Sequence, residues 1–148
     1  MQSNDEKKQT GILLARGAVR LLFDLGYAPL TEFTLASGRR VDVFGVGKNA
    51  SLIAVEIKSS RNDFLSDQKW QSYLEYCDQF YFAVPESFPT ELIPSHQGFM
   101  RVDQFSGSLI RQAKPSPVSA ARRKAILTRF ARTAASRLNL LNDPLRKL

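Results

Sequence analysis

The strand-like run from Ser51 to Ser59, within SLIAVEIKSS, limits the possible folds of this chain most strongly. A run this rich in Ile and Val is typical of a central strand that is covered on both faces. Glu56 and Lys58 interrupt the run, and strand alternation puts both side chains on the same face. Burying two charges is costly unless they pair or a function requires them. The run therefore predicts a buried strand with either an active-site pair or a structural ion pair.

The rest of the chain reads as alternating helices and strands. We expect helices at 6–25, 62–77 and 119–141, where apolar residues recur at helical spacing, and a short helix around Glu91. We expect strands at 30–36, 40–46, 51–59 and 79–84, and a hairpin of 98–104 and 108–112. The order α-β-β-β-α-β indicates one α/β domain with a mixed sheet over residues 1–148. Its core spans about 6–113, and a stiff Lys-Pro-Ser-Pro linker leads to a C-terminal helix at about 119–142.

Composition excludes several classes of protein. With 148 residues and 43% hydrophobic side chains, the chain can fill the core of one domain. A single cysteine, Cys77, excludes an internal disulfide, and a single histidine, His96, excludes a zinc site built from His and Cys. We interpret Cys77 as a half-buried helix residue. No apolar run is long enough to cross a bilayer, and Met1–Thr10 lacks a signal-peptide pattern. We therefore expect no membrane association and a cytoplasmic location.

Charge is distributed unevenly along the chain. Residues 1–100 contain ten Lys or Arg and twelve Asp or Glu, a net charge of −2, whereas residues 101–148 contain eleven and two, a net charge of +9. Such asymmetry indicates a near-neutral body with a cationic end that meets a polyanion. Nucleic acid is the commonest partner of this kind, and an anionic membrane surface is the alternative.

The C-terminal helix carries most of that positive charge. Six cations and no acid lie between Arg122 and Arg137, beside an apolar stripe of Leu127, Phe130, Ala134, Leu138 and Leu141. Arg122, Arg129 and Arg132 share one flank of the helix. We expect these three to contact the phosphate backbone of DNA, although a merely solvated basic face is the simpler alternative. No base-reading motif is visible, so such contacts carry no sequence preference.

A second carboxylate lies in the preceding strand, in RRVDVFGV, where Asp42 is flanked by Val41 and Val43. If the two strands are antiparallel neighbours, Asp42 and Glu56 can share a cation. Carboxylate oxygens suit a hard cation such as Mg²⁺, which can activate water for attack on a phosphodiester. A nearby lysine, Lys58, can stabilise the charge that develops on the phosphorus oxygens. A structural Glu56–Lys58 ion pair with a solvated Asp42 is the alternative.

These residues carry a resemblance to a known superfamily. Asp42, thirteen residues, and then Glu56-Ile57-Lys58 resemble the D…ExK signature of PD-(D/E)xK nucleases, which share a restriction-endonuclease-like α-β-β-β-α-β core. The segments GRRVDVFGV, VEIKSSRNDF and DQKWQSYLEYCDQFYFAVP resemble, more closely, the MmcB-like DNA-repair family, over roughly residues 10–112. Val41 stands where the signature often has Pro, a departure that is common in this superfamily.

The resemblance implies roles for individual residues. Asp42 and Glu56 would be metal ligands for Mg²⁺ or Mn²⁺, with the Ile57 main-chain carbonyl as a third ligand, and Lys58 would be the catalytic lysine. Related nucleases often place another acid upstream, and Glu32 is the nearest candidate here; an exposed edge-strand carboxylate is the alternative.

Many relatives also carry a polar residue and a Tyr one turn apart on the helix that follows. Lys69 and Tyr73 have this spacing and are the candidates for DNA contact, with a solvated lysine and an undecided tyrosine as the alternative.

Together these features predict a metal-dependent DNA-repair nuclease that hydrolyses phosphodiester bonds. A DNA-binding module that keeps the nuclease fold without catalysis is the main alternative. A protein that docks on membranes or partners through its basic helix is a third reading. The sequence leaves open whether the chain forms a homodimer.

Overall fold

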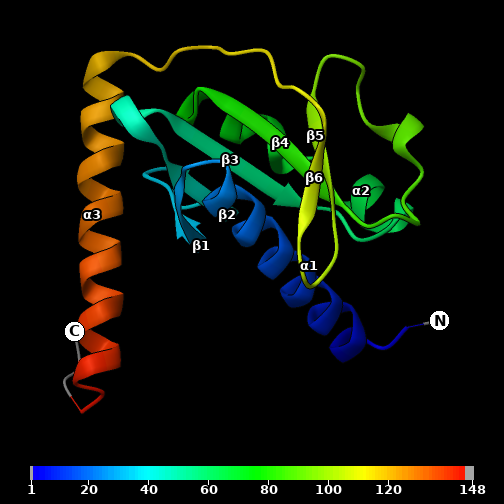
Figure 1. Cartoon of the computed structure of the whole chain (residues 1–148), viewed down its shortest axis with the longest axis horizontal. Helices are drawn as coiled ribbons and strands as arrows, with labels where there is room; N and C mark the ends of the chain where they lie inside the picture. The colour runs from blue at the N-terminus through cyan, green and yellow to red at the C-terminus, as the bar shows by residue number, and fades with distance from the viewer. Residues whose placement is uncertain (1, 146–148) are drawn as a thin grey trace.

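The computed structural model describes residues 2–145 as a six-stranded sheet with helices on both faces (Figure 1). The helices are α1 (Asn4–Asp24), α2 (Arg61–Ser66) and α3 (Ala120–Asn142), with 3₁₀ helices η1 (Lys48–Ala50), η2 (Lys69–Tyr76) and η3 (Thr90–Leu92). The strands are β1 (Ala28–Thr34), β2 (Arg40–Val46), β3 (Leu52–Ile57), β4 (Gln79–Val84), β5 (Gly98–Val102) and β6 (Gly107–Arg111). They lie in the order β1-β2-β3-β4-β5-β6.

The sheet is mixed, as the sequence predicts. β3 pairs in parallel with β4, and β4 with β5, whereas the other neighbours are antiparallel. The element order α1-β1-β2-β3-α2-β4 confirms the predicted core of the restriction-endonuclease-like type. Every residue of β3 is buried, which confirms that the Ile- and Val-rich run forms a central strand.

The prediction of one continuous helix over 62–77 is wrong, because the segment divides into α2 and η2. Asp67 ends α2 in an extended conformation, with φ −136° and ψ 112°. Its main-chain carbonyl accepts a hydrogen bond from Lys58 Nζ, and its side chain accepts one from the Lys69 amide. Asp67 is therefore held away from the helix by Lys58, the residue that directly follows β3.

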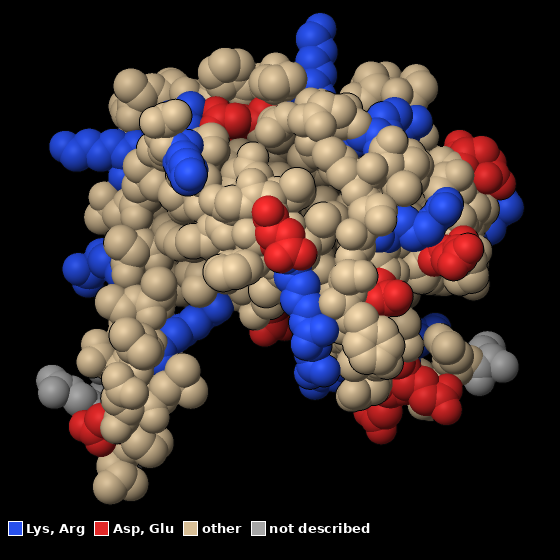
Figure 2. Space-filling view, viewed as in Figure 1, with Lys and Arg blue, Asp and Glu red and all other residues tan. Residues whose placement is uncertain are grey.

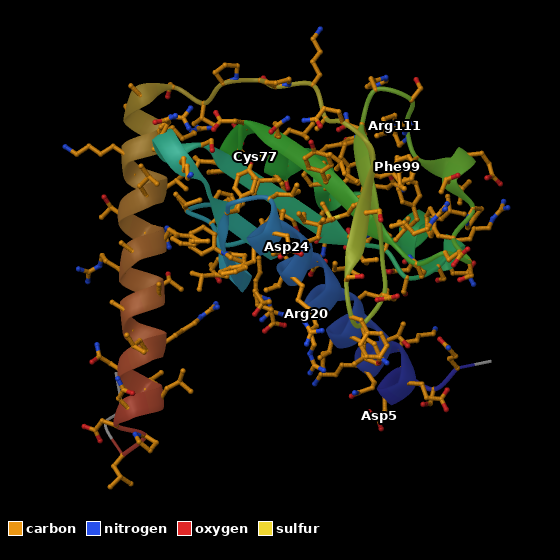
Figure 3. The ribbon with its side chains drawn as sticks, viewed as in Figure 1. Asp5, Arg20, Asp24, Cys77, Phe99 and Arg111 are labelled. Carbon is orange, nitrogen blue, oxygen red and sulfur yellow. The ribbon has the colours of Figure 1, made fainter. Side chains whose placement is uncertain are left out.

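Helix α1 covers one face of the sheet. Its buried face packs on the core that contains Val55 and Ile57, and Ser3 and Glu6 form a capping box at its start. Gly17 lets the β5–β6 turn approach, since a Cβ there would come within 1.7 Å of the Asp103 carbonyl oxygen. Arg20, on the same helix, donates a hydrogen bond to the Phe105 carbonyl in that turn (Figure 3).

An aromatic core fills the other face of the sheet, under η2 and α3. The rings of Trp70 and Phe82 lie 5.1 Å apart, and those of Phe33 and Phe130 lie 5.5 Å apart. Phe130 comes from α3, so this ring attaches the C-terminal helix to β1. Aromatic pairs at these separations each stabilise a core by about 1 kcal/mol beyond their burial.

Only the first half of α3 packs as its apolar stripe predicts. Ile126, which is outside the expected stripe, is buried, while Leu127 and Phe130 are partly buried. Leu138 and Leu141 remain 58% and 80% exposed. The C-terminal half of α3 projects beyond the body of the molecule (Figures 1 and 2), so the sheet ends before the stripe does.

Two further expectations concern single features of the chain. Cys77 lies directly after η2 and is 2% exposed, so it is more buried than expected. Burial, with help from neighbouring Asp78, raises the pKa of its thiol to about 12, which makes it a packing residue at neutral pH. Within residues 2–145, no helix combines the length and the apolar character needed to span a membrane.

Candidate active site

The antiparallel pairing of β2 and β3 brings the two predicted carboxylates together. Val43 pairs with Val55, and the same register continued by one residue places Asp42 opposite Glu56. The Ile57 amide donates a hydrogen bond of 2.8 Å to Asp42 Oδ2, which fixes this carboxyl against β3. The two carboxyl groups lie within hydrogen-bonding reach of each other. The structure therefore brings together the pair that the strand pattern predicts.

Glu56 is the most unusual titratable group of the chain. Its side chain is 5% exposed, and its Oε1 atom has no hydrogen-bond partner. Burial, then the hydrogen bond and charge of Asp42, raise the pKa of Glu56 well above its ordinary value, although Lys58 opposes this. Without a cation, this raised pKa favours the protonated form of Glu56 at neutral pH.

Lys58 is buried beside this pair. It lies two residues after Glu56 and is 2% exposed. Its Nζ atom donates a hydrogen bond of 3.3 Å to the Asp67 carbonyl and lies 4.0 Å from Asp67 Oδ2. The ion pair that the sequence suggested with Glu56 is thus formed with Asp67 instead, a residue that strand patterning does not identify.

Strands β1 and β2 depart from regular strand geometry near Glu32 and Asp42. Val41 and Val43 would share a face in a regular strand, yet they belong to the two opposite cores. Glu32, in β1, has a φ of +49°, which is rare for a residue with a side chain. Its carboxylate lies 3.9 Å from Arg40 and is largely exposed. Glu32 therefore stands at the rim of the site rather than beside Glu56.

The two residues expected on the following helix have different surroundings. Tyr73 is 4% exposed, and its hydroxyl donates a hydrogen bond to the Arg40 carbonyl at 3.2 Å. Burial, then the charges of Glu56 and Asp42, raise the pKa of Tyr73 to about 12. Tyr73 therefore contributes mainly to packing, whereas Lys69 is exposed.

One open cleft of ≈ 1780 Å³ collects these residues. It is lined by every member of the predicted catalytic and metal set and by both helix candidates: Glu32, Asp42, Glu56, Ile57, Lys58, Lys69 and Tyr73. Sequence reasoning missed several other lining residues, among them Asp67, Arg39 and the α1 residues Lys7, Lys8 and Arg16. Lys8 and Arg16 had a signal, because a spacing of eight residues keeps two side chains on the same side of a helix.

The comparisons with known proteins show the family of this chain. The family model of the MmcB-like DNA repair protein matches residues 2–145. The chain belongs to the MmcB-like DNA repair family. Among solved structures, a protein of unknown function from Silicibacter pomeroyi is 42% identical, with a TM-score of 0.90 over 94% of this chain and 95% of that one. No curated protein matches.

A second solved structure is more distant from this MmcB-like chain. It is a repair endonuclease from Pyrococcus abyssi, which is 16% identical and has a TM-score of 0.43. The match covers 70% of this chain and 49% of the endonuclease chain.

The donor set of this family member fits a hard divalent cation. Asp42 and Glu56 supply adjacent carboxylates, and the unpartnered Oε1 of Glu56 is an acceptor that a cation would satisfy. Among the described residues, no group of three or more His, Cys, Asp or Glu is placed to hold a metal. A cation here would therefore draw its other ligands from main-chain oxygens and water, which Mg²⁺ accepts readily.

The predicted DNA-binding arginines of α3 lie outside the cleft. Arg122 donates a hydrogen bond of 2.9 Å to Glu75 and lies over the Tyr76 ring, so it is already paired. Arg129 and Arg132 line a separate groove of ≈ 1030 Å³ between α3 and β1. Lys and Arg side chains project along the α3 side of the molecule in Figure 2. The residues predicted to contact DNA therefore lie on two separate surfaces. Lys69 and Tyr73 line the cleft, and the three arginines lie on α3.

Proposed function

We propose that this member of the MmcB-like family is a metal-dependent DNA-repair nuclease that hydrolyses the phosphodiester bonds of DNA. Its proposed catalytic residues are Asp42, Glu56 and Lys58. The observation that carries the proposal is the convergence of two facing carboxyls and a buried lysine in one open cleft. One of the residues that line this cleft, Glu56, has a buried acceptor atom, Oε1, without a partner. A structure pays for such an unsatisfied buried group only where a ligand or function offsets it.

Asp42 and Glu56 are the proposed metal ligands, with the Ile57 main-chain carbonyl as the third. Bound Mg²⁺ or Mn²⁺ would supply a polarised phosphate and a water of lowered pKa. The protein prepares for this in two ways. The Ile57 amide orients Asp42, and the surrounding apolar strands exclude solvent from the back of the pair, which strengthens its interaction with a cation.

Lys58 is the proposed stabiliser of charge on the phosphorus oxygens. Asp67 engages its amino group through a carbonyl at 3.3 Å, which leaves further donor hydrogens free to reach a phosphate in the cleft. Its burial fixes the side chain in one position before substrate binds. A donor that is already oriented costs no reorganisation when the negative charge develops.

A panel of nuclease substrates tests the proposal: single-stranded, duplex, flap and branched DNA, each with Mg²⁺ or Mn²⁺. We expect cleavage by the wild type, and none by Asp42→Asn purified in the same way. Lys58→Met should keep metal and DNA binding and lose about 10²-fold or more in rate. Glu86→Gln, an exposed carboxylate outside the cleft, is the matched control.

DNA binding without cleavage of any substrate would contradict catalysis. It would favour the second reading, a DNA-binding module that retains the nuclease fold. Cleavage that survives both Asp42→Asn and Lys58→Met would place the active site elsewhere.

A further inference from the structure

More cations than carboxylates line the active-site cleft. Seven cations line the cleft, and three of them, Lys7, Lys8 and Arg16, come from α1. Five carboxylates line it as well, and two of these are the Asp42–Glu56 pair. A polyanion that enters the cleft therefore meets an excess of positive side chains.

Outside the Asp42–Glu56 pair, the carboxylates of the cleft already have partners, whereas most of its cations do not. Asp63 accepts hydrogen bonds from the Ser59 amide and hydroxyl, Asp67 is near Lys58, and Glu32 is near Arg40. By contrast, within residues 2–145 no hydrogen bond or ion pair engages the side chains of Lys7, Lys8, Arg16, Arg39 or Lys69. The charged side chains of the cleft that lack a partner in the protein are therefore mostly cations.

The cleft-facing side of α1 carries small residues among its cations. Lys8, Ile12 and Arg16 recur every fourth residue and so share one face. Gly11 and Ala15 lie between the cations and leave the helix surface low, and a Cβ built on Gly11 meets nothing within 4 Å. Ile12 is 47% exposed there.

The acidic residues near the start of α1 do not oppose this surface. Asp5 and Glu6 do not line the cleft. Glu6 is held by the capping box, where its carboxylate accepts a hydrogen bond of 3.0 Å from the Ser3 amide.

Three of the five arginines of α3 are in the opposite situation. Arg122 is paired with Glu75, Arg123 with Asp78, and Arg137 donates to the carbonyls of Thr31 and Glu32. These three hold the helix against the protein. The N-terminal half of α1 and the whole of α3 also lie on opposite sides of the molecule (Figure 1), so the two surfaces can be tested separately.

We propose that the α1 trough, formed by Lys7, Lys8, Gly11, Ala15 and Arg16, is the phosphate-binding wall that holds a DNA strand across the active-site cleft. The small residues let the strand approach the helix, the cations on either side meet successive phosphates, and Ile12 contacts a sugar or base. The inference names the binding surface of the proposed nuclease site and so rests on the proposed function for its biological meaning.

Binding to fluorescent duplex and single-stranded DNA in EDTA tests the trough without any cleavage. Lys8→Gln with Arg16→Gln should weaken binding by roughly tenfold or more at low salt. It should also flatten the slope of log affinity against log salt by about 1.8 units on duplex DNA. Lys48→Gln with Lys114→Gln removes the same charge from exposed positions outside the cleft and should change both quantities much less.

A steric variant separates the shape of the trough from its charge. Gly11→Trp should fill the trough and lower DNA affinity, whereas Gly11→Ala should bind as the wild type does; circular dichroism checks that both stay folded. The proposal is overturned if the Lys8/Arg16 variant binds like its charge-matched control, or if Gly11→Trp binds normally. Because no metal is present, normal trough binding without nuclease activity would leave this inference standing while the proposed catalysis failed.

Discussion

At the scale of single residues, the proposed chemistry of the site rests on the Asp42–Glu56 pair. Burial and the neighbouring Asp42 raise the pKa of Glu56, so the folded protein holds a proton that the unfolded chain releases near pH 4. A group with a raised folded-state pKa stabilises the fold fully below its unfolded pKa. That stability is then lost as the pH rises toward the folded value. The buried Glu56 carboxyl group therefore lowers the free energy of unfolding of the metal-free protein at neutral and alkaline pH.

Glu56→Gln should remove this destabilisation, because glutamine has the same shape as a protonated glutamate and can still donate a hydrogen bond to Asp42. We expect the free energy of unfolding of the metal-free protein to rise by about 1 to 2 kcal/mol at pH 8, and much less at pH 5. Urea unfolding at the two pH values measures this. Equal stability of variant and wild type at pH 8 would show that the buried Glu56 carboxyl group does not destabilise the fold.

The residues differ in how far the sequence could predict them. Asp42, Glu56 and Lys58 were identifiable, because strand alternation is local and each stands out in an apolar run. The partners of Tyr73 and Arg122, which are the Arg40 carbonyl and Glu75, depend on tertiary packing. No local pattern could assign these two side chains to structural contacts.

At the scale of elements, one aspartate joins the C-terminal helix to the sheet. Asp78 accepts hydrogen bonds from the amides of Leu52 and Val118 and from both terminal nitrogens of Arg123. Partial burial works to raise the pKa of Asp78, but the bonds from Arg123, Val118 and Leu52 outweigh it and lower the pKa to about 2. The ionised Asp78 carboxylate therefore holds the start of α3 against the sheet.

Asp78→Asn should loosen α3, because an amide group cannot accept all of these hydrogen bonds and carries no charge for Arg123. We expect a loss of about 2 kcal/mol of stability at pH 7. The lowered pKa implies that this contribution is present above the unfolded value near pH 4 and disappears as the pH falls toward 2. Amide hydrogen exchange of residues 120–142 reports it; equal exchange rates in variant and wild type at pH 7 would contradict the account.

The elements themselves were largely predictable. The bounds of β2 and β4 agree with those expected from the sequence, because alternation and flanking turn residues mark both. The break between α2 and η2 was missed, since it depends on Lys58 capturing the Asp67 carbonyl. The exposure of Leu138 and Leu141 was missed as well, because periodicity shows which face is apolar but not how far the sheet extends beneath it.

At the scale of the whole molecule, two basic surfaces lie on opposite sides of the sheet. The α1 trough borders the active-site cleft, and α3 carries Arg129 and Arg132 over a separate groove. Only the first of these surfaces touches the residues proposed for catalysis. The second can extend the contact with a longer DNA without approaching the reacting bond.

Arg129→Gln with Arg132→Gln should therefore weaken the binding of long duplexes and leave short ones nearly unaffected. For a long duplex, we expect the salt slope to flatten by about 1.8 units, equally for unrelated sequences. Fluorescence anisotropy over a series of duplex lengths and salt concentrations measures this. An unaltered slope at every length would mean that α3 meets something other than DNA, such as a membrane or a protein partner.

The most direct test of the whole account is calorimetric titration of Mn²⁺ into the wild type, Asp42→Asn and Glu56→Gln. If the facing carboxyls form a metal centre, the wild type should bind Mn²⁺, and both variants should lose most of that affinity while remaining folded. Glu86→Gln should bind as the wild type does. Unchanged affinity in both Asp42→Asn and Glu56→Gln would contradict the metal centre and, with it, the proposed nuclease.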